Sequence, residues 1–442
     1  TIGGTPYTRG TWVIPMDQEF AELAREVLEV QKYPDMGDDL PYDAAGWTLP
    51  FQMHVRVDDV RAPLTADVRA AMQPVKGTPE AWGKSAEYPF VTNAVAAGIA
   101  GRPGALTGTG NHILLDPRQN NSFRFAARAL SAGGTVRFVP GAEPRWAVSG
   151  IDDATATAWA TEFSVTAERV TTVPAGPIAA RRVALYKAAP GNMDEGWTEW
   201  LLDTHGFAYS LIGPADLQAG NLAAKFDVIV TASQAFGSGG AGGGGRGGPG
   251  AGRGGRGGID TVAAQAAEAR TRAIDEFVAA GGTIVAWNQG ATAAATALRL
   301  PVRNVVATVP RQEYFTGVSI MQMNTDVTHP LMAGMPATAD VVVSSSPVFT
   351  TLEGFDGAVV AKFTASPLRS GFLNGAKYLQ NQAAALDVKK GKGHVVLLAF
   401  QPQWRGQPTG TFRTVFNALL YGSEVAAAAR ATPGFWTPTP VP

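Results

Sequence analysis

Two segments of the chain share a pattern in which an amphipathic helix ends at a glycine pair and a strand follows at once. The segments are HILLDPRQNNSFRFAARALSAGGTVRFV (112–139) and RAIDEFVAAGGTIVAW (272–287). Glycine just beyond a helix supplies the left-handed cap, and so short a join between helix and strand is the second half of a βαβ unit. Two such units, on either side of residue 180, predict an α/β architecture in both halves of the chain.

A boundary lies between these units. Residues 167–182 (AERVTTVPAGPIAARR) lose periodicity and contain two prolines and a glycine, and RRVALYKA (181–188) then begins a new strand. A chain of 442 residues is too long for one core. We therefore predict two Rossmann-like or flavodoxin-like α/β domains, followed by a Pro-rich tail. Their boundaries are 1–178 for an accessory domain, 179–428 for the second domain and 429–442 for the tail.

The N-terminal region contains one clear amphipathic helix after the apolar run TWVIP (11–15). Its apolar side chains fall at helical spacing on one face, and Asp17 is placed to cap it. These side chains are those of Phe20, Leu23, Ala24, Val27 and Leu28. The start of the chain, TIGGTPYTRG, has no signal-peptide pattern, and a chain that begins at threonine is expected to be a processed form or a fragment.

Composition excludes several classes of function. The net charge is −1 and only 17% of residues are charged, which does not produce the positive field that attracts nucleic acid or an anionic membrane. No apolar run approaches the length of a membrane span. Because the chain has no cysteine, it has no disulfide, no cysteine-ligated metal and no thiol nucleophile.

Residues 237–258 (GSGGAGGGGRGGPGAGRGGRGG) form a glycine tract that follows a predicted strand (226–232) and precedes a predicted helix. That position excludes a linker between domains. The tract has no lysine and no GxxxxGK[ST] motif, which argues against a phosphate-binding loop, and its three RGG triplets have no interleaved aromatic residue for stacking on bases. We predict an inserted loop that is ordered by contact with another chain.

Several stretches resemble the C-terminal, non-peptidase region of bacterial zinc carboxypeptidase-like proteins, whose catalytic domain is of the carboxypeptidase A type. They cover much of the chain: VIPMDQEFAELAREVLEVQKYPD, PYDAAGWTLPFQMHV, LLDPRQNNSFRFAARAL, NMDEGWTEWLLDTHGFAYSLI, LPVRNV and FQPQWRGQPTGTFRTVFNALLYG. The resemblance implies a zinc peptidase domain upstream, an exported precursor, and hence a periplasmic or extracellular location. It also implies that this region docks its own peptidase domain or other chains.

The chain itself lacks the zinc site that such a peptidase needs. That site takes two ligands from an HxxE motif and a third from a distant histidine, with a glutamate as general base. None of the five histidines has glutamate at the third following position, and no two of them lie within forty residues of each other. We therefore expect no metal and no cofactor in this chain, with zinc bound only by an upstream domain.

Residues 181–422 resemble a class I glutamine amidotransferase-like domain. The resemblance implies a nucleophilic cysteine on a turn after a central strand, and a histidine and glutamate in a late FHPE-like motif. Here TIVAW (283–287) leads into Asn288, and VVLLAF (395–400) leads into Gln401 and Gln403. Carboxamides cannot take a proton from a nucleophile or orient a base as a carboxylate does. The resemblance therefore implies a pseudoenzyme with a degenerate triad.

Candidate ligand-binding residues follow the first and last strands of this second domain. Asp194, Glu195 and Trp197 begin the helix after the first strand, and Trp404 and Arg405 follow the last strand. In an open α/β sheet the ligand edge lies outside the carboxyl ends of the strands, so we expect the two groups to meet there. The alternative is structural: Asp194 caps the helix, Glu195 favours the helix dipole and Trp197 packs in the core.

Two functions remain open from the sequence. The first is a non-catalytic accessory and assembly region of a zinc carboxypeptidase-like protein, in an oligomer or larger assembly formed through the glycine tract. The second is an amidotransferase-like protein that binds a small ligand or carbohydrate, or retains some hydrolytic activity, at the 194–197 and 401–405 edge. A filled edge and a large apolar interface favour the first, and a deep polar pocket at that edge favours the second.

Overall fold

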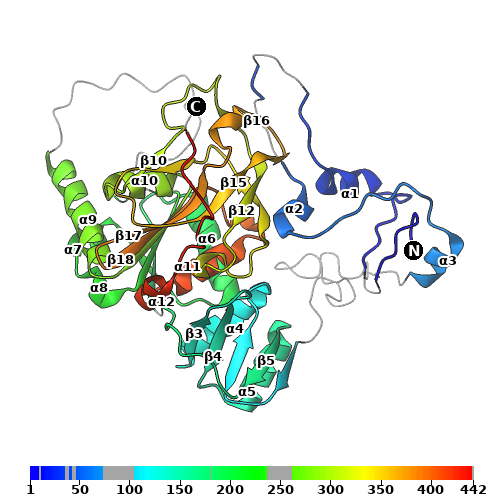
Figure 1. The fold of residues 1–442 in the computed structure, drawn as a ribbon, viewed down its shortest axis with the longest axis horizontal. Helices are drawn as coiled ribbons and strands as arrows, with labels where there is room; N and C mark the ends of the chain where they lie inside the picture. Colours follow the sequence, from blue (N-terminus) through cyan, green and yellow to red (C-terminus); the bar gives the residue numbers. More distant parts are fainter. Residues whose placement is uncertain are drawn as a thin grey trace.

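The structure is a computed structural model that describes residues 1–8, 11–34, 39–41, 46–72, 104–180, 182–234, 236 and 261–440. The glycine tract (237–258), its expected order and its expected contacts lie outside the described residues. Figure 1 shows an N-terminal arm in blue, a small domain in cyan, and a larger domain in green to red. None of the described helices is long and apolar enough to cross a membrane.

The small domain is a five-stranded sheet with two helices, in the sheet order β1-β5-β2-β4-β3. Its elements are β1 (Ala105–Gly108), β2 (His112–Leu115), α4 (Asn120–Ser131), β3 (Thr135–Val139), β4 (Arg145–Ser149), α5 (Asp153–Phe163) and β5 (Thr166–Val170). The strand–helix–strand unit predicted at 112–139 is present as β2, α4 and β3. From β2 to β5 the order is βαββαβ, the split βαβ arrangement.

The sheet of the small domain differs from the predicted Rossmann-like one in its strand directions. The short turn after β3 folds β4 back as a hairpin, and β4 then inserts between β2 and β3 and is antiparallel to both. In β3, buried Val136 and Phe138 alternate with half-buried residues, which is typical of a sheet covered on one face. The α/β class is confirmed, and a run of parallel strands is present only in the larger domain.

The larger domain contains five parallel strands in the order β7-β6-β8-β9-β18. This is the doubly wound 2-1-3-4-5 order, and its central strands are buried along their whole length, as covered parallel strands must be. Its elements are β6 (Val183–Tyr186), α6 (Met193–His205), β7 (Ser210–Ile212), α7 (Pro214–Ala219), α8 (Leu222–Lys225), β8 (Val228–Ala232), α9 (Thr261–Ala279), β9 (Thr283–Trp287), α10 (Gln289–Ala297), β18 (Gly393–Leu398), α11 (Phe412–Leu420) and α12 (Ser423–Ala428).

An antiparallel extension continues the sheet beyond β18 in the order β17-β15-β12-β13. The strands between α10 and β18 are β10 (Val302–Asn304), β11 (Phe315–Thr316), β12 (Ser319–Thr325), β13 (Thr338–Val343), β14 (Phe349–Thr351), β15 (Gly357–Ser370), β16 (Leu373–Asn374) and β17 (Ala383–Lys390). Short 3-10 turns lie at Pro330–Met332, Ala376–Tyr378 and Trp404–Gly406. The extension makes one wide mixed sheet from a parallel half and an antiparallel half.

The two domains share an apolar interface between α4 and α11. Phe123 of α4 packs on Phe416 of α11, with ring centroids 5.1 Å apart, and the buried Trp146 indole donates to Asn417 Oδ1 at 3.1 Å. The connection that contains the predicted 178/179 boundary adds to β3, since Ala179 N donates to Val136 O. The C-terminal tail also packs on the larger domain, where Lys362 Nζ donates to the carbonyl of Phe435 at 2.8 Å.

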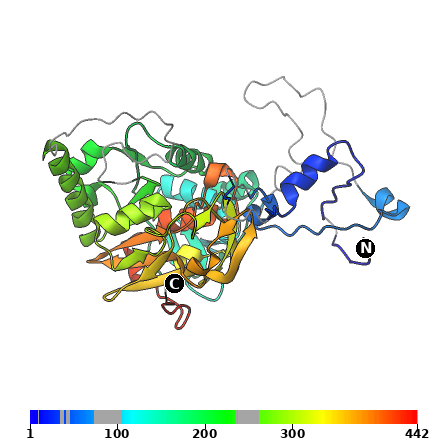
Figure 2. The same ribbon diagram turned by 90° about the horizontal axis from the view of Figure 1, so that it is seen from above.

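The N-terminal arm contains α1 (Ala21–Leu28), α2 (Leu49–Met53) and α3 (Ala66–Ala71) and projects to one side of the body in both views (Figures 1 and 2). It is anchored on the antiparallel extension, where Gln31 N donates to Ser370 Oγ at 3.0 Å and His54 Nε2 lies 2.8 Å from the carbonyl oxygen of Asp340. The predicted cap by Asp17 is wrong: α1 begins after Phe20, and the Asp17 carboxylate instead pairs with Arg69 at 2.6 Å.

Candidate functional site

The candidate site is the carboxyl edge of the parallel strands. We define this edge as the residues that follow β6 (187–195), β8 (233, 234 and 236), β9 (288–289) and β18 (401–405). The strand order reverses at β6, which lies between β7 and β8, so the switch point of the doubly wound sheet is at this edge. The sequence-predicted candidates all lie on it or within one turn of it.

The turn between β6 and α6 is held by Asn192. Its Oδ1 accepts from Glu195 N at 2.7 Å and its Nδ2 donates to Ala232 O at 3.1 Å, which ties the helix start to the end of β8. Asn192 is therefore the N-cap, and the alternative that Asp194 caps the helix is wrong. The Asp194 carboxylate accepts from Ser233 Oγ instead. Burial raises the pKa of Asp194, although the Ser233 hydroxyl and the nearby Arg405 guanidinium oppose that rise.

Gln403 joins the last strand to α6. Its Nε2 donates to the Asp194 carbonyl at 2.8 Å and to Thr198 Oγ1 at 3.1 Å, and the Gln403 side chain is fully buried. The 194–197 and 401–405 groups therefore meet, as predicted. Side chains of the second group are packed where the two groups meet. Trp404 is buried there, and the Arg405 guanidinium stacks over its ring at 4.9 Å. Trp197, which is half-buried, packs edge-on against Trp200 with ring centroids 5.6 Å apart.

The turn after β9 has the strained geometry that a nucleophile position requires but carries an amide. Asn288 has φ +52° and ψ −127°, a conformation that is costly for a side chain other than glycine. A Cβ at Gly290 would lie 3.0 Å from Thr231 O, so only glycine lets α10 pack this closely on β8. The backbone of the turn thus keeps a nucleophile-like arrangement, while the Asn288 side chain has no nucleophilic atom.

Three buried carboxamide oxygens at this edge lack hydrogen-bond partners within the described parts of the chain. They belong to Asn288 (Oδ1), Gln401 (Oε1) and Gln403 (Oε1), whose side chains are at most 6% exposed. A carboxamide oxygen accepts hydrogen bonds but does not titrate near neutral pH. These three carboxamide oxygens can accept hydrogen bonds from a donor, and the carboxamides themselves cannot act as general acids, general bases or nucleophiles.

A carboxylate pair at the edge, formed by Glu195 and Glu199, was not predicted from the sequence, where Glu195 was a candidate without Glu199. Lys187 Nζ lies 3.1 Å from Glu195 Oε1 and 2.7 Å from Glu199 Oε1. Burial of Glu195, together with the adjacent Glu199, raises the pKa of Glu195 to about 7, and Lys187 opposes that rise. The i,i+4 spacing of Glu195 and Glu199 on α6 was the available signal, since such residues are neighbours on a helix.

A buried polar network lies at the opposite end of β18. His394 Nδ1 is 2.8 Å from Asp387 Oδ1, and Tyr421 OH donates to Asp387 Oδ2 at 2.7 Å. His329 packs against the same Tyr421 ring at a centroid distance of 5.8 Å, although it is far from His394 in the sequence. In the part of the chain that the structure describes, no three His, Asp or Glu side chains are grouped so as to hold a metal ion.

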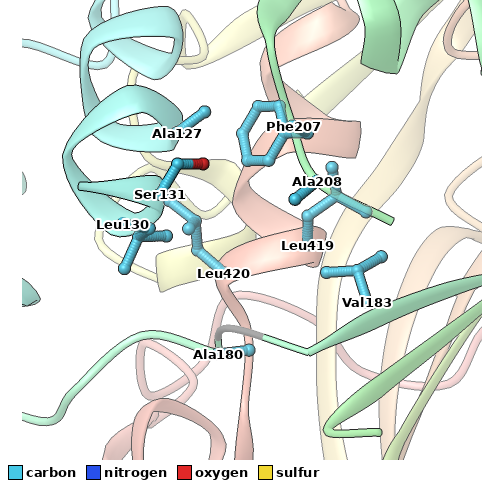
Figure 3. A pocket seen from close by; sticks show the side chains of 9 residues that line it. All are labelled: Ala127, Leu130, Ser131, Ala180, Val183, Phe207, Ala208, Leu419 and Leu420. Atoms are coloured by element: carbon cyan, nitrogen blue, oxygen red, sulfur yellow. The ribbon is translucent and has the colours of Figure 1, made fainter. Parts of the chain in front are cut away.

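A small cavity lies between the two domains, away from the carboxyl edge (Figure 3). Its volume is about 80 Å³, against the roughly 300 Å³ or more typical of ligand pockets. Its lining is mostly apolar: Ala127, Leu130, Ser131, Ala180, Val183, Phe207, Ala208, Leu419 and Leu420. This cavity is a packing defect of the interdomain interface.

Comparisons with known proteins give only weak likenesses. No family model matches the chain, and no curated protein matches it in sequence. Among solved structures, it is similar to a protein described as a GMP synthase subunit from Thermoplasma acidophilum, at 11% identity and a TM-score of 0.34, covering 56% of this chain and 94% of that one.

Two further structures show similarity at the same level. A ThuA-like protein from Bacteroides uniformis is 11% identical with a TM-score of 0.32, covering 56% of this chain and 94% of that one. A β-galactosidase from Bacillus circulans sp. alkalophilus is 10% identical with a TM-score of 0.32, covering 57% of this chain and 32% of that one. Likenesses of this strength assign no function, which has to be inferred from the chain's own residues.

Proposed function

We propose that this chain is a non-catalytic accessory and assembly region that binds protein through its N-terminal arm. The observation that carries the proposal is a set of large apolar side chains exposed on the arm. They are Trp12 (64% exposed), Ile14 (48%), Met16 (42%), Phe20 (64%), Leu23 (61%), Val30 (38%), Trp47 (40%), Met53 (38%), Val55 (52%) and Val57 (49%). These side chains all lie between residues 12 and 57, and exposed apolar surface gathered on one segment of a folded chain is typical of a protein-binding site.

The carboxyl edge supports a role without catalysis. The three positions that correspond to the amidotransferase triad carry carboxamides, and Gln403 is bonded to the backbone of α6. Trp404 is buried at this edge, and the exposed Arg405 guanidinium stacks over its ring. A pseudoenzyme domain with a filled edge and an exposed apolar arm fits assembly better than turnover.

The wider setting of the proposal rests on the resemblance to zinc carboxypeptidase-like proteins. In that setting the arm docks the peptidase domain of the same protein or another chain, outside the cytoplasm in a periplasmic or extracellular location. Any zinc would be bound by the peptidase domain. The observed partners of the histidines of this chain are protein groups such as the Asp340 carbonyl and the Asp387 carboxylate.

The proposal is tested by the double substitution Phe20→Asp with Leu23→Asp. Because neither side chain is buried, we expect the melting temperature to stay within a few degrees of that of the original chain. Phe123→Ala is the matched control: it empties a fully buried site in the α4–α11 interface and should cost about 3–5 kcal/mol. If the arm variant melts as early as the control, the arm supports the chain's own core and the proposal fails.

A second candidate function, binding of a small ligand or carbohydrate at the carboxyl edge, is favoured by one observation. The unpartnered oxygens of Asn288, Gln401 and Gln403 are neutral acceptors, which suit the hydroxyl groups of a neutral ligand. Thermal melts in millimolar glucose, maltose and glycerol test it. A rise in melting temperature with one of them, absent in Gln401→Leu, would support binding, and no rise with any of the three would count against it.

A further inference from the structure

The end of α2 contacts the larger domain through a histidine. His54 Nε2 lies 2.8 Å from the carbonyl oxygen of Asp340 in β13. Because a carbonyl can only accept a hydrogen bond, Nε2 carries the proton of the neutral ring and Nδ1 carries the lone pair. Nδ1 is buried and has no hydrogen-bond partner among the residues that the structure describes. The site therefore suits the neutral ring, and a second proton on the ring would have no acceptor there.

The backbone of the larger domain lies close against this ring. A Cβ at Gly410 would be 2.5 Å from His54 Cγ, so the loop before α11 passes directly beside the imidazole. Gly410 N also donates to Gln52 O at 2.9 Å, which ties the same loop to α2. His54 itself is the C-cap of α2 with φ +53°, a backbone conformation that is uncommon outside glycine. The docked position of α2 thus depends on a close fit around an uncharged ring.

The charged groups around the imidazole oppose its protonation. Burial and the nearby Arg413 guanidinium of α11 lower the pKa of His54, and the hydrogen bond to the Asp340 carbonyl opposes that fall. Burial lowers the pKa of Arg413 to about 10, and Asp116 of the small domain favours its charged form, so Arg413 stays charged in mild acid. The Asp340 carboxylate, whose pKa burial raises, is paired with Arg369 of β15 at 3.2 Å.

The other described contacts between this part of the arm and the body do not change their charge near neutral pH. Gly46 N donates to Val318 O at 2.7 Å, and the Arg369 guanidinium lies over the Phe51 ring at 4.5 Å. Backbone amides and guanidinium groups keep their protons between about pH 5 and 8, whereas an imidazole titrates there. On α1, which also packs against α2, the charged groups are the exposed pair of Glu22 and Arg25, and exposed Glu26.

We propose that His54 is a pH-sensitive latch, which holds α2 on the larger domain when the ring is neutral and releases it when the ring is protonated. In the undocked arm the imidazole is solvated and titrates near its ordinary pKa of about 6.5. The docked state binds fewer protons, so docking is fully stabilised above about pH 6.5 and weakens as the pH falls below that value. The inference goes beyond the proposed function, because it concerns how the arm is held and not what it binds.

Amide hydrogen exchange of the full chain at about pH 7.5 and about pH 5.5 tests the latch, with rates corrected for the intrinsic effect of pH. The Gly410 amide reports docking, because it donates to α2, and the amides of Thr283–Trp287 report global unfolding. We expect protection at Gly410 to fall several-fold, and by up to about tenfold, between the two pH values. Thr283–Trp287 should remain far better protected than Gly410 at both.

Variants at position 54 assign the effect. His54→Gln keeps a donor for the Asp340 carbonyl but does not titrate, so it should dock at about pH 7.5 and lose the pH effect at Gly410. His54→Phe cannot form the bond, so protection at Gly410 should be low at both pH values and independent of pH. The matched control is His205→Gln, which removes a buried histidine elsewhere in the larger domain and should keep the full pH effect at Gly410.

Three results would overturn the inference. The first is protection at Gly410 that does not change between the two pH values. The second is a pH effect at Gly410 that persists in His54→Gln or His54→Phe, which would assign it to another group such as Asp340. The third is exchange at Gly410 as slow as at Thr283–Trp287, which would mean that α2 leaves the body only when the whole chain unfolds.

Discussion

At the scale of single residues, the pseudoenzyme interpretation depends on which side chains occupy the turn after β9 and the residues after β18. Asn288 keeps the strained turn after β9, and Gln403 is bonded to the Asp194 carbonyl at 2.8 Å. The loss of acid–base groups could be predicted from the sequence, because the residue types are visible in it. The bonds of Gln403 to α6 and the pairing of Glu195 with Lys187 could not be predicted, since they depend on how α6 packs against the residues that follow β18 and β6.

We expect no release of ammonia from glutamine by this chain. The turn at Asn288 has no thiol or hydroxyl to attack an amide, and a carboxamide at position 401 cannot serve as a base. The measurement is a coupled ammonia assay with excess glutamine, with heat-denatured protein as the blank. Activity above the blank that disappears in Gln401→Ala would contradict the pseudoenzyme interpretation.

The stability of the fold should fall in mild acid because of His205. This side chain packs against Phe416 with ring centroids 4.5 Å apart, and burial lowers its pKa from 6.5 to about 4. Between about pH 6.5 and pH 4, His205 therefore stays neutral in the folded state, whereas it takes up a proton in the unfolded state. The stabilisation is complete above about pH 6.5 and falls by roughly 3 kcal/mol as the pH drops to about 4.

Melting temperatures measured between pH 7.5 and pH 4.5 test this expectation. The chain should melt at progressively lower temperature as the pH falls below about 6.5, and His205→Gln should show a shallower dependence. The melting temperature of His205→Gln should still fall to some extent as the pH drops, because burial also lowers the pKa values of His54 and His329. An unchanged pH dependence in His205→Gln would show that this histidine does not contribute.

At the scale of elements, local patterns account for the parallel half of the sheet. The segments that form β6, β8 and β9 were predicted because buried parallel strands appear in a sequence as continuous apolar segments bounded by turn residues. The helix α6 was predicted between β6 and the next strand. The antiparallel extension was not predicted, since its strands are interrupted by bulges and Pro- or Gly-containing turns, as in β15. The insertion of β4 between β2 and β3 was also not predicted, because pairing partners are chosen by tertiary contacts.

Deleting residues 239–256 from the glycine tract should leave the fold intact. β8 and α9, which flank the tract, belong to the same domain, and the cost of closing a loop depends only weakly on its length. Because the tract is predicted to contact other chains, association is expected to change. Thermal melting and light scattering of the deletion variant check both points. A large loss of melting temperature with unchanged molecular mass would make the tract a support of the domain's own core.

At the scale of the whole molecule, two domains joined by an apolar interface carry an arm. The arm is held to the body by hydrogen bonds such as that of Gln31 and by ring contacts such as that of Arg369 on Phe51. The interface buries Phe123, Phe416 and Trp146, whereas the arm leaves its largest apolar side chains exposed. The sequence predicted α1 as an amphipathic helix. It did not reveal that α1 lies beside the body with Leu23 61% exposed and with Val27 and Leu28 half-buried, because amphipathicity alone does not say what covers a helix.

The central claim is that the arm around α1 is only loosely held in the isolated chain and is available to another protein. Native-state amide hydrogen exchange of the isolated chain tests this most directly, since exchange reports how readily each segment opens. The account predicts that amides of Ala21–Leu28 exchange orders of magnitude faster than those of the buried strands Thr283–Trp287 and Gly393–Leu398. Protection of Ala21–Leu28 equal to that of these strands would mean that the chain already covers α1, and would contradict the account.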